Sequence, residues 1–287
     1  RLRQALDLGV THFDTAALYG FGANEKLVGD VLGKRPDHVI VASKCGLFGR
    51  DGKRVMDGRP EAIRATCEES LRNLRTDRID LYYLHRWEKR LPIEESVGAM
   101  ARLVERGLTR YIGLSEASDN SIQRARKVYP ICSLQMEYSL WSRDPERGNI
   151  QACRDYNMGF MAYSPLGRGF FAGIVHGAKD LTEGDGRNGH PRFQPENLER
   201  NVRLLSQFEE IAKEKGVTPA QLALAWLMAQ GKDIIPIPSN KTQAHLEENI
   251  KATEITLTPE DLARLDAIFR PEAVAGPRSR DMHRVNI

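Results

Sequence analysis

Several features are missing from this chain of 287 residues, and each absence excludes a class of protein. No apolar run approaches the roughly 20 residues of a membrane-spanning helix, so no membrane association is expected. The net charge is only +3 and no basic run is interleaved with aromatic residues, which argues against nucleic acid as a partner. The four cysteines form neither a CxxC pair nor a zinc pattern with histidine. We therefore expect reduced, buried thiols, no metal ion and a cytoplasmic location.

Short apolar runs alternate along the chain with longer segments of helical period. The runs predict strands at residues 11–15, 39–44, 79–85, 110–115, 133–138, 159–164 and 234–239. The segments between them predict helices at residues 2–8, 25–33, 60–74, 93–106, 119–128, 146–156, 219–230 and 243–250. Several strands are almost continuously apolar, which is typical of parallel strands covered on both faces. The alternation therefore predicts an α/β protein with helices outside a parallel sheet.

The fold class that fits this alternation is a (β/α)8 TIM barrel, forming a single domain over residues 1–287. Such a barrel has eight strands, whereas the sequence shows seven and opens on a helix, so we expect the first strand to lie upstream of Arg1. An open, doubly wound sheet also fits seven strands, but the GxGxxG fingerprint of that fold does not follow the first strand. Two extra helices, at residues 197–215 and 259–269, lie outside the repeat. Residues 171–195 predict a long loop that is either a functional lid or a mobile insertion.

The active site of such a barrel lies at the C-terminal ends of its strands. Asp14, Tyr19, Lys44 and His85 fall at or just after three successive predicted strands. Each has a simpler interpretation, as a turn cap, a loop cover, a solvated strand end or a core histidine. Because four such residues occur at successive strand ends, one shared functional site explains them better than four unrelated structural roles.

These four side chains suit the reduction of a carbonyl group. A free tyrosine has a pKa near 10, which makes it a weak acid at neutral pH, and a nearby ammonium group favours its phenolate form. Lys44 can supply that ammonium group and Asp14 can hold it in place. His85 can donate a hydrogen bond to the carbonyl oxygen and polarise it.

Several motifs, in order along most of the chain, resemble the aldo-keto reductase family. The segments that carry the resemblance are Phe13-Asp14-Thr15-Ala16, Tyr19-Gly20, Asn24-Glu25, Ser43-Lys44, the run from Asp80 to Arg86, Ile112-Gly113-Leu114-Ser115, the run from Gln135 to Leu140, the run from Tyr163 to Gly169, Ile237-Pro238-Ser239 and Glu247-Glu248-Asn249. Two further segments are similar to the bacterial and plant branch that includes perakine reductase-like proteins, namely the runs from Tyr138 to Arg143 and from Phe193 to Asn197.

The resemblance implies NADPH-dependent reduction of aldehydes or ketones by the catalytic tetrad Asp14, Tyr19, Lys44 and His85, with Tyr19 as the proton donor. It also implies a set of cofactor contacts. These are Ser115 and Gln135 at the carboxamide, Tyr163 on the nicotinamide, the segment Ser164, Pro165, Leu166, Gly167, Arg168 and Gly169 at the pyrophosphate, Ser239, Asn240 and Lys241 at the adenosine phosphate, and Glu248 and Asn249 at the adenine.

Two residues depart from the family pattern. Glu116 stands where Asn is frequent, which affects the carboxamide contact, and Thr242 stands where a second basic residue often follows Lys241. A single lysine is a point charge without the fork geometry of arginine, so NADP preference over NAD is expected to be weaker than usual, with His245 as a possible helper.

Other residues carry open alternatives. Trp87, Trp141 and Arg86 are candidate substrate contacts. Alternatively, the tryptophans are packed or exposed loop aromatics and Arg86 is a local ion-pair partner. Cys45 is either a thiol activated by the neighbouring Lys44 or a buried bystander.

Two other function classes compete with the reductase. Channel β-subunits share the fold and the tetrad and act mainly as cofactor-binding regulatory partners. A metal-dependent barrel hydrolase is disfavoured because no His-x-His pair ends a strand. The sequence predicts neither the substrate nor the oligomeric state.

Overall fold

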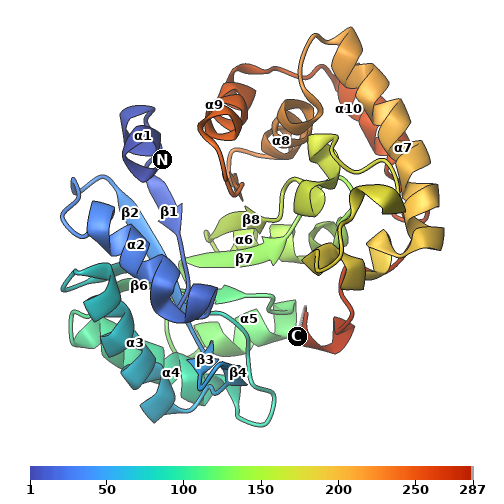
Figure 1. The fold of residues 1–287 in the computed structure, drawn as a ribbon. Helices are drawn as coiled ribbons and strands as arrows, with labels where there is room; N and C mark the ends of the chain where they lie inside the picture. The colour runs from blue at the N-terminus through green and yellow to red at the C-terminus, as the bar shows by residue number, and fades with distance from the viewer. Residues whose placement is uncertain (286–287) are drawn as a thin grey trace. The chain divides into compact units, whose positions relative to one another are not determined.

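The computed structural model describes residues 1–285, and the chain divides into two compact units (Figure 1). The first unit comprises Arg1–Gln135 with Ala152–Gly159, and the second comprises Met136–Gln151 with Phe160–Val285. Each unit has its own strands, helices and buried side chains.

Parallel strands form the centre of the first unit. In order across the sheet they are β1 (His12–Asp14), β2 (Ile40–Cys45), β5 (Ile79–Leu84), β6 (Thr109–Ser115) and the first residues of β7 (Ser133–Glu137). All of these pairings are parallel, with Asp14 opposite Ala42, Lys44 opposite Tyr83 and Ser115 opposite Gln135. The predicted strands in this part of the chain are therefore confirmed, to within two residues at each end.

Helices follow these strands, as the alternation predicted. They are α1 (Leu2–Asp7), α2 (Ala23–Leu32), α3 (Pro60–Leu74), α4 (Ile93–Glu105) and α5 (Asp119–Arg126). Helix α2 packs on α3, and α3 packs on α4, along one side of the sheet (Figure 1). Pro60 occupies the first position of α3, where its missing N–H costs no hydrogen bond. Gly107 follows α4 with φ +73°, a conformation that ends the helix without steric cost.

A β-hairpin that the sequence analysis did not predict follows β2. It consists of the antiparallel strands β3 (Leu47–Arg50) and β4 (Lys53–Met56). Asp51 and Gly52 form its turn with φ values of +50° and +71°. An Asp-Gly pair with both φ values positive is a preferred two-residue hairpin turn, so the signal was present in the sequence.

The second unit contains β8 (Gly159–Tyr163) from Phe160 onward, paired in parallel with β9 (Ile234–Ile237) from Phe160 opposite Ile234 to Tyr163 opposite Ile237. Its helices are α7 (Pro195–Glu214), α8 (Pro219–Ala229), α9 (Gln243–Lys251) and α10 (Pro259–Ile268). Thr218 and Thr258 cap α8 and α10 in complete capping boxes, which confirms the predicted helix starts. Helices α7 and α10 lie side by side (Figure 1).

Two segments of the chain differ from the prediction. The helix expected from residue 146 begins later, as α6 (Asn149–Asp155), because residues Asp144–Arg147 form a separate 3-10 turn with a proline near its start. The predicted loop at residues 171–195 contains 3-10 turns at Ala178–Asp180, Gly186–Gly189 and Pro191–Phe193. These short turns satisfy backbone groups in a segment that has no hydrophobic periodicity.

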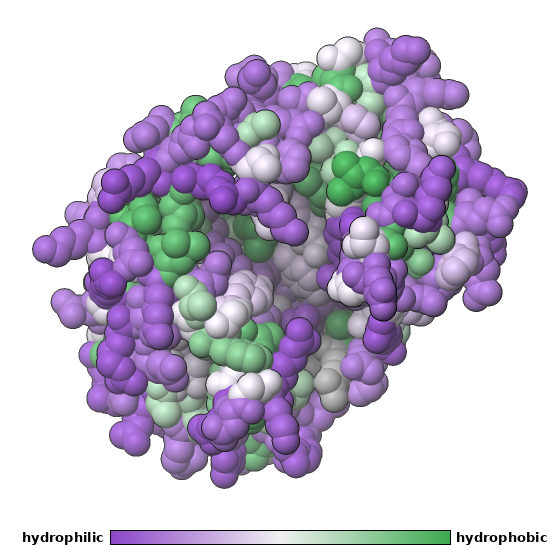
Figure 2. All heavy atoms as spheres, viewed as in Figure 1, coloured by the Kyte–Doolittle hydropathy of each residue, from purple (hydrophilic) through white to green (hydrophobic). Residues whose placement is uncertain are grey.

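Most of the face shown in Figure 2 is hydrophilic, and hydrophobic residues appear on it in separate groups. Some large apolar side chains, such as Leu27 and Ile174, are exposed. Single exposed residues of this kind are common on globular proteins. Within residues 1–285, no helix combines the length and the apolar character that crossing a membrane requires.

Candidate active site

The polar side chains predicted at the strand ends share one face of the first unit's sheet. Side chains alternate across a strand, so residues two apart point to the same face. Asp14 lies opposite Ala42, and Lys44 follows Ala42 by two residues on β2, so Lys44 points to the same face as Asp14. Lys44 in turn lies opposite Tyr83, which places His85 on that face as well. The pleat of the parallel sheet therefore brings residues from three strands together.

An ion pair between Lys44 and Asp14 forms the centre of this cluster. The Lys44 ammonium donates hydrogen bonds to Asp14 Oδ1 and, over 2.8 Å, to the carbonyl oxygen of Thr15. The Lys44 side chain is completely buried, and that of Asp14 is 10% exposed. Gln135 Nε2 donates to the second carboxylate oxygen of Asp14 over 2.9 Å. Burial without such partners would be costly for both charges, so the pair is fixed in place.

Tyr19 lies at the start of a 3-10 turn between β1 and α2, and it remains 38% exposed. The Lys44 ammonium nitrogen is 4.9 Å from the centroid of the Tyr19 ring. A hydrogen bond of 2.7 Å from Thr15 Oγ1 to Asn24 Oδ1 connects the two ends of this loop. The loop is thereby held with an accessible phenol beside a buried cation.

His85 completes the cluster with an uncharged imidazole. Its ring contacts the Tyr19 ring edge to face, with 5.8 Å between the centroids. Burial is the main reason why the pKa of His85 lies well below its usual 6.5, and the positive charges of Lys44 and Arg86 lower it further. The Nδ1 atom is buried and has no hydrogen-bond partner in the part of the chain that the structure describes. A neutral imidazole can donate a hydrogen bond at neutral pH.

The opposite face of β2 anchors this arrangement to the helices. Ser43 Oγ donates to Glu25 Oε1 over 2.6 Å, and Asn73 Nδ2 donates to Glu25 Oε2 over 3.1 Å. Glu25 lies on α2, directly after the Tyr19 loop, and is fully buried. A Cβ atom on Gly22 would lie 3.0 Å from Asn73 Nδ2, so this glycine allows close contact between the loop and α3. The network ties β2, α2 and α3 together.

The other predicted residues of the first unit lie close to the cluster. Arg86 Nη1 donates to the His85 carbonyl oxygen over 2.6 Å and to Ser115 Oγ over 3.0 Å. Trp87 Nε1 donates to the Leu91 carbonyl oxygen over 2.8 Å. Cys45 is completely buried, and burial raises the pKa of its thiol, so the bystander interpretation is supported. The substrate contacts of Arg86 and Trp87 stay predictions.

Glu116, the first departure from the family pattern, is fully buried and has a positive φ of 54°. Its backbone N–H donates to the carbonyl oxygen of Gln135 over 3.0 Å, which continues the pairing of β6 with β7. The hydrogen-bond pairing of the sheet therefore extends as far as Glu116, which stands where Asn is frequent in the family.

In the second unit, the segment after β8 forms a tight turn. Ser164, Gly167, Arg168 and Gly169 have φ values of +50°, +56°, +59° and +87°. Pro165 and Gly167 are buried, while Tyr163, Ser164 and Leu166 are partly exposed. A Cβ atom on Gly167 would lie 2.7 Å from Trp141 Nε1, so only glycine fits beneath that indole. Within the turn, the backbone N–H groups of Gly167 and Gly169 donate to the carbonyl oxygens of Ser164 and Leu166 over 2.9 and 3.0 Å, and the pyrophosphate contacts of this segment stay a prediction.

The residues predicted around the adenosine end follow β9. Ser239, Lys241 and His245 are exposed, and Glu248 is half-buried. Thr242, the second departure, caps α9 by accepting a hydrogen bond from the His245 backbone, which gives this threonine a structural role.

Asn249 is a buried polar residue at the same end of the second unit. Its Nδ2 atom donates to Asn240 Oδ1 over 2.6 Å. Its Oδ1 atom is buried and accepts no hydrogen bond from residues 1–285. An orphaned acceptor of this kind suits an N–H donor on a bound ligand, such as the amino group of adenine.

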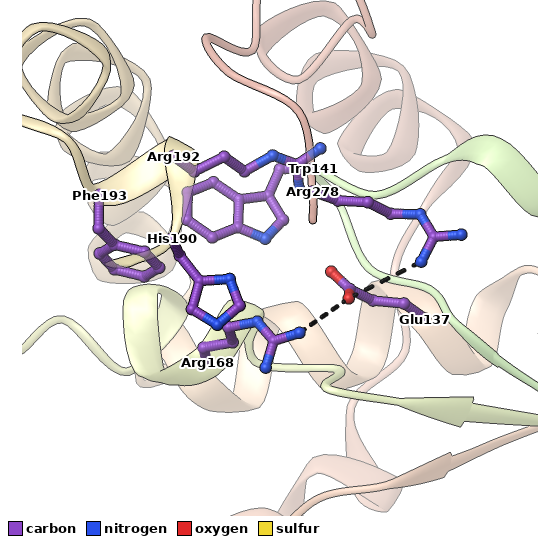
Figure 3. Close-up of a pocket in the computed structure, with 7 residues that line it drawn as sticks. All are labelled: Glu137, Trp141, Arg168, His190, Arg192, Phe193 and Arg278. Carbon is purple, nitrogen blue, oxygen red and sulfur yellow. Dashed lines mark hydrogen bonds and ion pairs between the residues drawn. The ribbon is translucent and has the colours of Figure 1, made fainter. Parts of the chain in front are cut away.

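A narrow, charged pocket in the second unit combines Trp141 and Arg168 with residues that the sequence analysis did not assign, namely Glu137, His190, Arg192, Phe193 and Arg278 (Figure 3). Trp141 stacks on Phe170 at 4.1 Å between centroids and is 4% exposed. This burial favours the packed-aromatic interpretation of Trp141, although its substrate contact stays a prediction. Burial lowers the pKa of Arg192 to about 10 and that of His190 to about 4.

The profile of the Aldo/keto reductase family matches residues 1–270. The chain is 42% identical over 281 residues to a Glycine max protein named probable aldo-keto reductase 1, covering 96% of this chain and 80% of that protein. The chain belongs to the aldo/keto reductase family. It is therefore an oxidoreductase of the aldo-keto reductase type, and the predicted family is confirmed.

Solved structures agree with this assignment. A glycerol dehydrogenase from Gluconobacter oxydans aligns with a TM-score of 0.87 at 30% identity, over 94% of this chain and 85% of that chain. An aldo/keto reductase from Klebsiella pneumoniae in complex with NADP and acetate aligns with a TM-score of 0.73 at 28% identity, over 100% of this chain and 87% of that chain. The predicted (β/α)8 barrel class is confirmed for this enzyme, and the open, doubly wound alternative is wrong.

Glu137 is the functional candidate that sequence reasoning missed most clearly. It lies two residues after Gln135 on β7, so the strand period directs both side chains to the same face. That spacing was visible in the sequence, but the arginines that neutralise Glu137 come from distant segments.

No group of three or more His, Cys, Asp or Glu side chains that could hold a metal ion occurs within the described residues.

Proposed function

We propose that this aldo-keto reductase reduces aldehydes or ketones to alcohols with NADPH, and that Tyr19 donates the proton. The observation that carries the proposal is the buried Lys44–Asp14 pair, with its ammonium nitrogen 4.9 Å from the Tyr19 ring centroid and the uncharged His85 beside it. The bound cofactor supplies the hydride that adds to the carbonyl carbon.

The four side chains divide the remaining work. The neutral His85 donates a hydrogen bond to the carbonyl oxygen, which polarises the C=O bond and orients the substrate. Tyr19 gives its phenolic proton to that oxygen as negative charge develops on it. The Lys44 ammonium stabilises the phenolate that remains, because opposite charges attract strongly in a buried environment. Asp14 holds the ammonium group in position through their ion pair, and the phenolate regains a proton from solvent because Tyr19 is 38% exposed.

Residues of the second unit fit the cofactor. The orphaned Oδ1 atom of Asn249 suits the adenine amino group, with Glu248 next to it. The turn Ser164–Gly169 would hold the pyrophosphate, and Tyr163 would stack on the nicotinamide. Lys241, with His245 and Ser239, would meet the phosphate that distinguishes NADPH from NADH. The Klebsiella pneumoniae structures with NADP and NADPH support this cofactor.

Two expectations from the sequence stay predictions, namely a single domain over residues 1–287 and a cytoplasmic location. The substrate is a small carbonyl compound, as family membership implies.

The experiment compares the native full-length protein with Tyr19→Phe in NADPH oxidation with a panel of aromatic and aliphatic aldehydes. Loss of one proton donor should lower kcat by roughly 100-fold or more while the Kd for NADPH stays within about threefold. Tyr111→Phe is the matched control, because Tyr111 is an exposed tyrosine on β6 outside the cluster, and it should retain full activity.

Two other outcomes of this comparison would contradict the proposed function. Equal turnover by native protein and Tyr19→Phe would refute the proposed proton donor. Tight NADPH binding by a native protein that turns over none of the aldehydes would favour the regulatory, sensor-like alternative.

A further inference from the structure

The turn after β8 adopts a backbone conformation that needs external support. Ser164 and Arg168 have φ values of +50° and +59°, in the left-handed region that side chains with a Cβ atom disfavour. Strained residues of this kind persist only where surrounding contacts hold them. Backbone hydrogen bonds within the turn hold it in part, and side chains outside it supply further support.

Two residues from the end of β7 and the loop that follows supply that support. Arg168 Nη2 donates to Glu137 Oε2 over 3.2 Å. The Trp141 indole covers Gly167 so closely that a Cβ atom there would lie 2.7 Å from Nε1. Figure 3 shows the Glu137 carboxylate pointing toward the guanidinium groups of both Arg168 and Arg278.

Glu137 is itself held by several groups. Ser142 Oγ donates to Glu137 Oε1 over 2.8 Å, and Arg192 Nη1 donates to Ser142 Oγ over 2.7 Å. Arg278 Nη1 lies 3.9 Å from Glu137 Oε2, and its Nε donates to Asp144 over 2.9 Å. The Glu137 side chain is only 4% exposed, so these charge-assisted bonds act where water screens them little. A carboxylate fixed in this way can serve as a rigid anchor.

We propose that Glu137 is a positioning residue that acts through Arg168. Its carboxylate holds the turn Ser164–Gly169 in the conformation that receives the cofactor's pyrophosphate. The inference rests on the proposed function, which assigns this turn to the cofactor. It goes further by naming the residue that pre-forms the turn before the cofactor arrives.

The direction in which cofactor affinity changes distinguishes a positioning role of Glu137 from direct repulsion between its carboxylate and the pyrophosphate. A carboxylate near a pyrophosphate repels it, so removing its charge would strengthen binding if repulsion dominated. Under our proposal, Glu137→Gln leaves Arg168 and Arg278 without their shared negative partner, and the turn loosens. Cofactor affinity therefore falls.

The first measurement is hydrogen exchange in the cofactor-free, full-length protein. The amides of Gly167 and Gly169 bond to the carbonyl oxygens of Ser164 and Leu166 over 2.9 and 3.0 Å. These amides should exchange about tenfold faster in Glu137→Gln, since a bond to a charged group is lost. Glu146→Gln is the matched control: Glu146 also accepts from an arginine, Arg143, at 2.7 Å, and from Tyr138, and both of these partners lie outside the turn.

The second measurement is titration of NADPH by fluorescence, with kcat at saturating cofactor. Glu137→Gln should raise the Kd for NADPH about tenfold and leave kcat within about twofold. In Arg168→Met, adding Glu137→Gln should produce no further loss of affinity, because the two residues act as one unit.

Each outcome decides the inference. Exchange unchanged in both Glu137→Gln and Arg168→Met overturns it, and so does equal or tighter NADPH binding by Glu137→Gln. If Glu137→Gln does not fold, Arg168→Met decides alone, because Arg168 is one-third exposed and its exchange prediction is the same. If the native protein does not bind NADPH, the proposed function fails, while the exchange measurement still decides the role of Glu137.

Discussion

Replacement of Asp14 by Asn should destabilise the folded protein strongly. The variant keeps the shape of the side chain and can still accept the hydrogen bond from Gln135 Nε2. It removes the only carboxylate bonded to the Lys44 ammonium within residues 1–285, and Lys44 then keeps the Thr15 carbonyl oxygen as its acceptor. An ammonium group that is completely buried cannot recover this loss from water.

The magnitude follows from the burial of both partners. Breaking a buried ion pair by removing one charge costs about 3–5 kcal/mol, so we expect the free energy of unfolding to fall by about 4 kcal/mol. That is a change of nearly three orders of magnitude in the unfolding equilibrium. Lys44→Met should cost a similar amount, because it leaves the Asp14 carboxylate without its cation. The double variant Asp14→Asn with Lys44→Met should cost less than either single change, since no buried charge remains.

The assay is urea unfolding of the full-length protein at neutral pH, followed by tryptophan fluorescence. The matched control is Glu199→Gln, which breaks the pair with Arg203 on α7. Those side chains are 72% and 73% exposed, so the control should change stability by less than about 0.5 kcal/mol. The reasoning is refuted if Asp14→Asn is as stable as this control, or if the costs of the two single changes simply add in the double variant.

Three further predictions concern other parts of the structure. Because the pKa of His85 lies well below 6.5 in the folded protein, the unfolded chain gains a proton below that pH that the folded state does not. Stability should therefore fall by up to about 1.4 kcal/mol per pH unit below pH 6.5, and His85→Gln should flatten the profile in urea titrations; an unchanged slope would contradict this. Gly167→Ala should destabilise by about 2 kcal/mol or more, since its Cβ atom would lie 2.7 Å from Trp141. The control Gly184→Ala has a positive φ but open space around it, so thermal melts should show a smaller loss; equal losses would exclude crowding as the cause. Cys132 is exposed and the other three cysteines are buried, so one thiol should react with a thiol reagent in the native protein and none in Cys132→Ser.

Local sequence patterns were sufficient to predict most strands and helices of this protein. The seven parallel strands lie within two residues of their predicted ends, because apolar runs are local signals. Helices α8 and α10 begin where predicted, because the cap residues Thr218 and Thr258 act over a few positions. The hairpin after β2 was missed even though Asp51-Gly52 is a turn signal, because its flanking strands do not alternate regularly between apolar and polar residues. The start of α6 was misplaced by three residues, since a 3-10 turn and a helix have the same local signals there.

The candidate site shows the same division between local and distant information. The sequence placed Asp14, Tyr19, Lys44 and His85 at or just after three successive strands, and the structure brings the four side chains together. The role of Trp141 was left open because burial of an aromatic depends on its neighbours. Here Phe170 and Phe193, from segments far along the chain, enclose it.

What the sequence determined by itself is the βα rhythm, the polar residues at the strand ends and the residue types available for proton transfer. These follow from short apolar runs, from helical periodicity and from the chemistry of each group, which need no knowledge of distant segments. Only the tertiary structure decided which charges are buried and paired. The neutral state of His85, the ion pair of Lys44 and the anchoring of Arg168 by Glu137 all depend on removing water from groups far apart in the chain. Desolvation is a property of the whole fold, so no local pattern encodes it.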